Sequence, residues 1–267
     1  MDVFGFDALI GDFRLSDYGL MLATFSFNDS FDIGMSMETK EVYLPKNPVP
    51  VYLESDYKSK LTPTITIIQN EKISNKIYFT TDEIRDILRR LTGYQGYKRF
   101  YIYGYDFMED LYFNIRFTDV EFEKSAGNIV GIRLNAECDS PFAWIDEEYN
   151  FDIQNSNQDI VVRNDSDDIY NYLLPKITIT FNSTGSNFTI TNTTDNNRQT
   201  KINSFSANET IIIDSNIGKV SSSLARSLAN EFNYIFPKLI SGDNTLKISH
   251  TSNISISMKL PRKVGMI

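Results

Sequence analysis

The spacing of apolar residues predicts one amphipathic helix in a first half that is otherwise rich in β-structure. Thr80 and Glu83 form a capping box, in which each side chain can accept a hydrogen bond from the backbone N–H of the other residue. The apolar residues that follow recur at i, i+3, i+4 and i+7, on one helix face: Ile84, Ile87, Leu88 and Leu91. The helix is then predicted to end at Gly93. We expect this helix to pack on a sheet.

The rest of the first half has the alternation and the β-branched content of strands. Two short runs, 49–53 and 65–68, lie close to prolines, which predicts strands at sheet edges because proline has no N–H to donate. Residues 97–105 form an aromatic strand. Residues 111–123 form a longer strand whose apolar parity changes at residues 118–119, and this slip predicts a β-bulge.

A turn at residues 125–128 leads from this strand into a return strand, so the two form a long hairpin. The apolar residues of the return strand occupy every second position and predict one buried face: Ile132, Leu134, Ala136 and Cys138.

The second half is almost entirely strand and turn. Its alternating apolar positions predict core-facing side chains in several short strands: Ile177, Ile179, Phe181, Phe188, Ile190, Leu246, Ile248, Ile254, Ile256, Met258 and Leu260. Such a series over about 120 residues is typical of a β-sandwich or jelly roll. One set is spaced by four and fits either a short helix or a strand-to-turn crossing: Leu224, Leu228, Phe232 and Phe236.

Composition changes near residue 147. Residues 1–146 hold 13 Phe and 7 Asn, whereas residues 147–267 hold 6 Phe and 17 Asn, and the net charge changes from −8 to −1. We therefore predict two domains with these bounds, joined within the polar stretch 146–168. The predicted fold class is mainly β with one helix: a first domain resembling a β-sandwich, with the helix and the long hairpin, and a second β-sandwich.

The residue inventory excludes several kinds of active site. One cysteine cannot make an internal disulfide, and one cysteine with one histidine cannot complete a Cys/His zinc site. Glu121 and Glu123 lie two apart and share one strand face, but such spacing is common on solvated faces, and nothing marks them as buried. The acidic loop 164–168 lacks the glycine and the distal glutamate of a calcium loop. We expect no catalytic residue, no metal and no cofactor.

Targeting signals and net charge also limit the partners. The start of the chain carries Asp2, Asp7 and Asp12 and no basic residue before Arg14, unlike a secretory signal. No run of about 18 apolar residues occurs. The net charge of −9 disfavours binding to a polyphosphate. We expect folding in a cytoplasm, with no membrane contact and no specific binding of nucleic acid.

Tyrosines of the predicted aromatic strand share one face, because they share odd parity: Tyr97, Tyr101, Tyr103 and Tyr105. The stripe fits a sheet face packed under the helix. It equally fits a protein interface, because tyrosine combines a large area with a polar tip. The sequence leaves both interpretations open.

Three stretches of the sequence resemble siphophage distal tail proteins. SDYGL at 16–20 is similar to their opening, and ECDSPFAW at 137–144 resembles the end of their first domain. The stretch 236–244, followed by PRKVG at 261–265, resembles the close of their second domain. The order of elements agrees as well, and the resemblance covers essentially the whole chain.

The resemblance implies a structural virion protein without enzymatic activity. In this family the first domain forms a ring, typically a hexamer, which joins the tail tube to the tip or baseplate, and the second domain is galectin-like. The implied partners are further copies of the chain, the tail tube, tape-measure and tail tip proteins and, in some phages, receptor-binding proteins. The implied location is the virion tail, assembled in the cytoplasm of the bacterial host.

The alternative is a β-sandwich carbohydrate-binding or hydrolytic module of a tail or cell-surface assembly. Trp144 is the only tryptophan, so the second half lacks an indole on which a sugar ring could stack. Tyr170 or Tyr172 could substitute for it. A cleft with converging carboxylates beside aromatic rings would favour this alternative.

Overall fold

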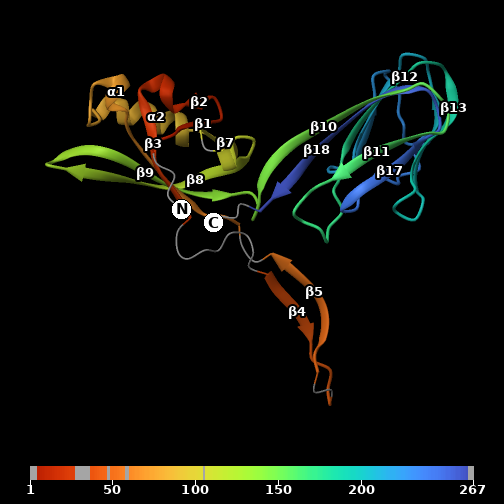
Figure 1. The fold of residues 1–267 in the computed structure, drawn as a ribbon, viewed down its shortest axis with the longest axis horizontal. Coiled ribbons are helices and arrows are strands. Elements are labelled where there is room, and N and C mark those ends of the chain that lie inside the picture. Colours follow the sequence, from red (N-terminus) through yellow and green to blue (C-terminus); the bar gives the residue numbers. More distant parts are fainter. Residues whose placement is uncertain (1–4, 28–36, 47–48, 58–59, 105, 264–267) are drawn as a thin grey trace. The chain divides into compact units, whose positions relative to one another are not determined.

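The computed structural model describes residues 5–27, 37–46, 49–57, 60–104 and 106–263. The chain forms two compact units, one of residues 1–144 with 262–267 and the other of residues 145–261 (Figure 1). The chain therefore enters the second unit after Trp144 and returns to the first at Arg262.

The first unit is built on a strongly curved antiparallel sheet. Its strands are β1 (Asp7–Ile10), β2 (Phe13–Arg14), β3 (Leu20–Phe27), β6 (Pro63–Gln69), β7 (Lys98–Tyr103), β8 (Tyr112–Ser125) and β9 (Asn128–Cys138). Their order is β2-β1-β7-β8-β9-β6-β3. An isolated bridge joins Phe6 to Leu22, so the β1 end of the sheet returns to β3 and the sheet curls around its core.

The predicted helix is α2 (Thr81–Thr92), and its capping box is confirmed. Thr80 Oγ1 accepts a hydrogen bond from the Glu83 N–H at 3.3 Å, and Glu83 Oε2 accepts one from the Thr80 N–H at 2.8 Å. Ile84, Ile87 and Leu91 bury one helix face in the core of the first unit.

The structure also contains a one-turn helix that was not predicted, α1 (Glu71–Ser74). It begins where Asn70 Oδ1 accepts a hydrogen bond from the Lys72 N–H at 3.2 Å. One turn is too short for a periodic apolar pattern, so the sequence carries no such signal for it. Two short 3₁₀ helices, η1 (Leu15–Tyr18) and η2 (Asp106–Met108), complete the helical segments of the described part.

The long hairpin has the predicted form. The β8–β9 register shifts between Phe117 and Asp119, which confirms the bulge. The four residues predicted to face the core, Ile132, Leu134, Ala136 and Cys138, are buried. Burial, together with the neighbouring carboxylates, raises the pKa of the Cys138 thiol and keeps it protonated.

One prediction about strand position and one about the linker are wrong. Strand β6 lies between β3 and β9, not at an edge, because Pro63 is its first residue and its missing N–H interrupts no ladder in the strand interior. The stretch 146–168 is not a linker, because most of it lies in strands β10 and β11.

A separate two-stranded ribbon is also part of the first unit. Strand β4 (Met37–Val42) pairs only with β5 (Val51–Tyr57) in the described part of the chain (Figure 1). We call residues 37–46 and 49–57 the ribbon.

The second unit is a β-sandwich, as predicted. One sheet has the order β10-β18-β12-β15-β16 and the other β11-β17-β13-β14. The strands are β10 (Ala143–Ile153), β11 (Gln158–Asn164), β12 (Lys176–Phe181), β13 (Gly185–Asn192), β14 (Arg198–Phe205), β15 (Thr210–Asp214), β16 (Lys219–Ser222), β17 (Gly242–Ile248) and β18 (Ser252–Arg262). All the apolar residues predicted to face the core in the alternating strands are buried between these sheets.

The residues spaced by four do not form a helix. Residues 223–236, which we call the edge loop, run beside the edge strand β14 instead. The Asn233 N–H donates to the Lys201 carbonyl at 3.2 Å, and Ile202 forms an isolated bridge with Phe232. Leu228 and Phe232 are buried in the core of the sandwich.

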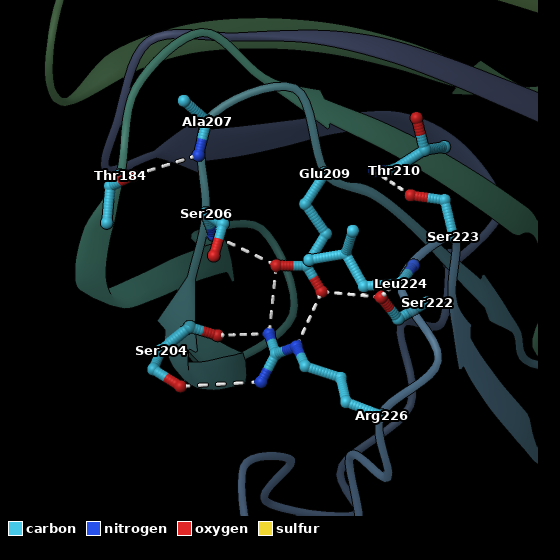
Figure 2. A network of polar contacts seen from close by, with 10 residues as sticks. All are labelled: Thr184, Ser204, Ser206, Ala207, Glu209, Thr210, Ser222, Ser223, Leu224 and Arg226. Carbon is cyan, nitrogen blue, oxygen red and sulfur yellow. Dashed lines mark hydrogen bonds and ion pairs between the residues drawn. The ribbon is translucent and has the colours of Figure 1, made fainter.

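A buried ion pair fastens the edge loop, as Figure 2 shows. Arg226 donates from Nε and Nη2 to the two carboxylate oxygens of Glu209, at 2.8 and 3.0 Å. Arg226 Nη2 also donates to the Ser204 carbonyl at 2.8 Å. Glu209 is 0% exposed. Burial alone would raise its pKa, but the hydrogen bonds from Arg226, Ser222 and Ser206 lower it below the ordinary value.

Candidate interaction surface

The two faces of β7 differ in their surroundings. Phe100 and Ile102 are buried in the same core as helix α2. Tyr101 and Tyr103 point to the opposite face and are partly exposed. The interpretation of the tyrosine stripe as a face packed under the helix is therefore wrong, because the even-numbered residues occupy that position. Tyr105 lies outside the described residues.

Tyr101 is the centre of a group of aromatic rings and arginines. Its ring is stacked on that of Tyr103, with centroids 6.3 Å apart, and lies 5.4 Å from that of Tyr112. Arg99 lies over the Tyr112 ring at 4.3 Å and donates from Nη1 to the Tyr101 hydroxyl at 3.1 Å. Arg14 lies over the Tyr103 ring at 5.0 Å. The arginines hold the rings by cation–π contacts.

Tyr97 lies just before β7 and belongs to a second group, with side chains of β8 and β9 and with Lys60. Its hydroxyl donates to Glu137 Oε1 at 2.9 Å and accepts from Lys60 Nζ at 2.9 Å. Arg116 Nη2 donates to the same Glu137 oxygen at 2.7 Å, and its guanidinium lies 5.7 Å from the Tyr97 ring centroid. The hydrogen bond from Tyr97, with the charges of Arg116 and Lys60, lowers the pKa of Glu137.

Arg14 is fixed by a carboxylate at the other end of this surface. Its Nε donates to Asp7 Oδ2 at 2.7 Å, and Ser16 donates to Asp7 from both its hydroxyl and its N–H. Burial alone would raise the pKa of Asp7, but these hydrogen bonds lower it, so the carboxylate stays ionised at neutral pH.

These side chains share one side of the sheet, and we call them the Tyr–Arg face. They are Arg14, Tyr97, Arg99, Tyr101, Tyr103, Tyr112 and Arg116. Tyrosine and arginine are enriched in the centres of protein interfaces and among residues that contribute most to binding. The arrangement can bind a protein surface through large planar groups that are already held in place.

The sequence pattern predicts only part of this face. Arg99 has the same odd parity as the tyrosines, so the pattern within β7 could have revealed it. Arg14, Tyr112 and Arg116 come from β2 and β8, and only the pairing of the strands brings them to β7. Tyr112 is 1% exposed although it lies outside the main core cluster, because its neighbours on the face cover it.

The two tyrosines considered for sugar stacking lie in the second unit. The Tyr172 ring has two cations over it, Arg198 at 5.4 Å and Lys238 at 5.3 Å, and its hydroxyl donates to Asp195 at 3.3 Å. Tyr172 is nonetheless 42% exposed. Tyr170 is 80% exposed.

The described residues contain neither a candidate metal site nor a candidate membrane-spanning helix. In that part of the chain, no group of three or more His, Cys, Asp or Glu side chains could hold a metal ion. Over the same residues, no helix has the length and the apolar character needed to cross a membrane.

Comparisons with known proteins give a consistent family. A family model described as a phage tail protein N-terminal domain matches residues 5–140, and one described as a phage tail C-terminal domain matches residues 142–258. Among curated protein sequences, none matches this chain at a significant level.

Solved structures agree in fold. The Dit protein of phage SPP1, described as a paradigm of the hub adsorption apparatus in phages that infect Gram-positive bacteria, superposes with a TM-score of 0.70 and 12% identity, over 96% of this chain and 99% of that chain. A chain of the phage P2 baseplate in its activated, calcium-containing conformation gives a TM-score of 0.51 and 9% identity, over 99% and 100%. The family models cover most of the sequence, so this chain belongs to the family of phage tail proteins, as its resemblance to siphophage distal tail proteins predicted.

Proposed function

We propose that this chain is a structural hub at the distal end of a phage tail, where copies form a closed ring that joins the tail tube to the tip or baseplate and docks adhesion components. The observation that carries this proposal is the match to the hub protein of phage SPP1 over nearly the full length of both chains. The two phage-tail family models support it. The proposal includes no catalytic step.

The Tyr–Arg face is the part of the ring interface that we assign. Its rings and guanidinium groups are held by one another, so little side-chain freedom is lost when a partner covers them. Closed rings require a head-to-tail contact between two different patches of the same chain. The Tyr–Arg face is one of these patches.

The test is the mass of the purified chain in solution, measured by mass photometry with negative-stain electron microscopy. We expect hexameric rings for the unmodified chain. Tyr101→Ala with Tyr103→Ala should yield monomers that melt close to the parent temperature, because both rings are partly exposed. The control is Tyr170→Ala, which removes a more exposed tyrosine from the second unit and should keep the ring. A chain that stays monomeric at high concentration, and is absent from tail particles, contradicts the proposal.

The remaining assignments follow the family. We propose that residues 1–146 form the ring and that residues 147–267 form a galectin-like domain. The proposed partners are the tail tube, tape-measure and tail tip proteins and a receptor-binding protein, in a tail assembled in the host cytoplasm. Co-purification of tagged chain with each of these tail proteins tests them one by one, and a chain that retains none of them contradicts the hub role.

A further inference from the structure

The outer edge of β16 carries backbone groups that no strand of the described chain pairs with. In the described residues, β16 pairs only with β15. The Ser223 N–H donates to the Thr210 carbonyl at 2.8 Å. Because bonded and non-bonded positions alternate along an antiparallel pair, Ser221 also bonds to β15. The N–H and C=O groups of Val220 and Ser222 therefore point away from β15, toward the open edge.

A cleft lies beside this edge, between β16 and the edge loop. Its volume is about 480 Å³, within the range of ligand pockets. We call it the edge cleft. The edge loop contributes mainly small and apolar side chains to it, among them Leu224, Ala225, Leu228, Ala229 and Tyr234. Leu224 and Tyr234 are 44% and 62% exposed, so an apolar group that entered the cleft would bury large apolar side chains.

The walls of the edge cleft are held in place within the second unit. Arg226 is fixed by its bonds to the buried Glu209 (Figure 2). The Tyr234 hydroxyl donates to the Ala229 carbonyl at 2.9 Å. Tyr234 also has a φ of +58°, a left-handed conformation that a bulky residue seldom adopts and that is concentrated at binding sites. A guest would meet a cleft that is already formed, at little cost in ordering.

The register and the charge of the edge cleft define the guest. Val220 and Ser222 lie opposite the buried Ile213 and Ile211, so their side chains face the core side of the sheet. A residue of an added strand directly opposite Val220 would share that side and point into the cleft. The one charged side chain among the described lining residues is Arg226, and it is already paired. The cleft therefore favours an uncharged, apolar side chain.

We infer that an extended peptide segment of a different protein adds to the edge of β16 as a further strand and places an apolar side chain in the edge cleft. Backbone hydrogen bonds supply affinity in this mode of recognition, and the cleft supplies specificity. A second copy of β16 does not fit, because its apolar core-side residue, Val220, packs against its own core. The inference goes beyond the proposed function, which assigns no binding site to the second unit.

The test uses the full chain and a library of labelled eight-residue peptides. In each peptide threonine alternates with one apolar residue, which varies across the library, and fluorescence anisotropy measures binding. We expect at least one member to bind. Its form with N-methyl groups on the apolar residues should not bind, because these residues must donate to β16. Its form with N-methyl groups on the threonines should bind.

Variants of the chain locate the bound peptide. Val220→Pro removes an outward N–H without breaking the ladder to β15, and should weaken binding about tenfold. Val220→Ala keeps that N–H and should bind nearly as well as the unmodified chain. Ala225→Trp fills the cleft from an exposed position and should abolish binding. Ala207→Trp places the same ring at another exposed alanine of the second unit and should leave binding unchanged.

The outcomes separate this inference from the proposed function. A library without a binder, or a binder that Ala225→Trp and Val220→Pro both retain, overturns the inference. Neutral oligosaccharides that bind the unmodified chain but not Ala225→Trp, in the absence of any bound peptide, would assign the cleft to a sugar and overturn it as well. All four variants should keep the ring, because none of them alters the Tyr–Arg face. A monomeric unmodified chain that binds the peptide contradicts the ring and supports the inference.

Discussion

The ribbon and the edge loop differ in how strongly buried side chains anchor them to the rest of the chain. The ribbon has regular strands, but the described residues show its apolar tip exposed. The edge loop has no regular structure, yet Phe232 and Leu228 are buried and Arg226 is paired with a fully buried carboxylate. The loop also covers the edge of β14, where an open row of backbone groups would invite unwanted pairing. Regular secondary structure is thus no measure of how firmly a segment is held.

The largest expected difference concerns side-chain removal from the two segments. Phe232→Ala should lower the free energy of unfolding of the second unit by about 3–4 kcal/mol, because it leaves a cavity in the sandwich core. Leu53→Ala should change the stability of the monomer by less than about 0.5 kcal/mol, because the side chain is 58% exposed. Urea unfolding measures both free energies, at protein concentrations too low for the chain to assemble. Equal losses would contradict the comparison.

The ion pair of the edge loop should have the next largest effect. Arg226→Met leaves the buried Glu209 carboxylate without its cation, and the expected loss is about 3 kcal/mol in the free energy of unfolding. Arg163→Met removes an arginine whose two carboxylate partners are exposed and serves as the control, with a loss below about 1 kcal/mol. If both variants lose the same amount, the pair does not fasten the loop.

A smaller effect should appear on acidification. The pKa of Glu209 is lower in the folded protein than its ordinary value of 4.5, so its ionised form stabilises the fold above that value. This contribution is lost as the pH falls through the lowered pKa. The stability advantage of the unmodified chain over Glu209→Gln should therefore shrink in acid. Thermal melts between neutral and acid pH measure it, and a constant difference would show that Glu209 does not titrate as described.

Local patterns predicted the parts of the fold whose signals are local. The capping box of α2, the alternation in β9 and the bulge at residues 118–119 each lie within one short stretch of chain, and the structure has all three. The position of β6 was mispredicted because the nearby proline occupies the first strand residue, where it interrupts nothing.

The anchors of the edge loop and the composition of the Tyr–Arg face depend on pairings between distant residues. Glu209 and Arg226 are neither adjacent nor in one periodic segment. Arg116 reaches Tyr97 only through the register of β7 with β8. Parity within β7 predicted that the tyrosines share a face, but the choice between core and surface required the position of Phe100 and Ile102. The local pattern of a single sequence does not indicate which distant residues are in contact.

The central claim is that the single chain holds the edge loop firmly and the ribbon weakly. Amide hydrogen exchange of the Tyr101→Ala, Tyr103→Ala variant, followed by mass spectrometry, tests it most directly. We predict fast exchange in residues 37–46 and 49–57 and slow exchange in residues 223–236. Equal exchange rates in the two segments would contradict the account.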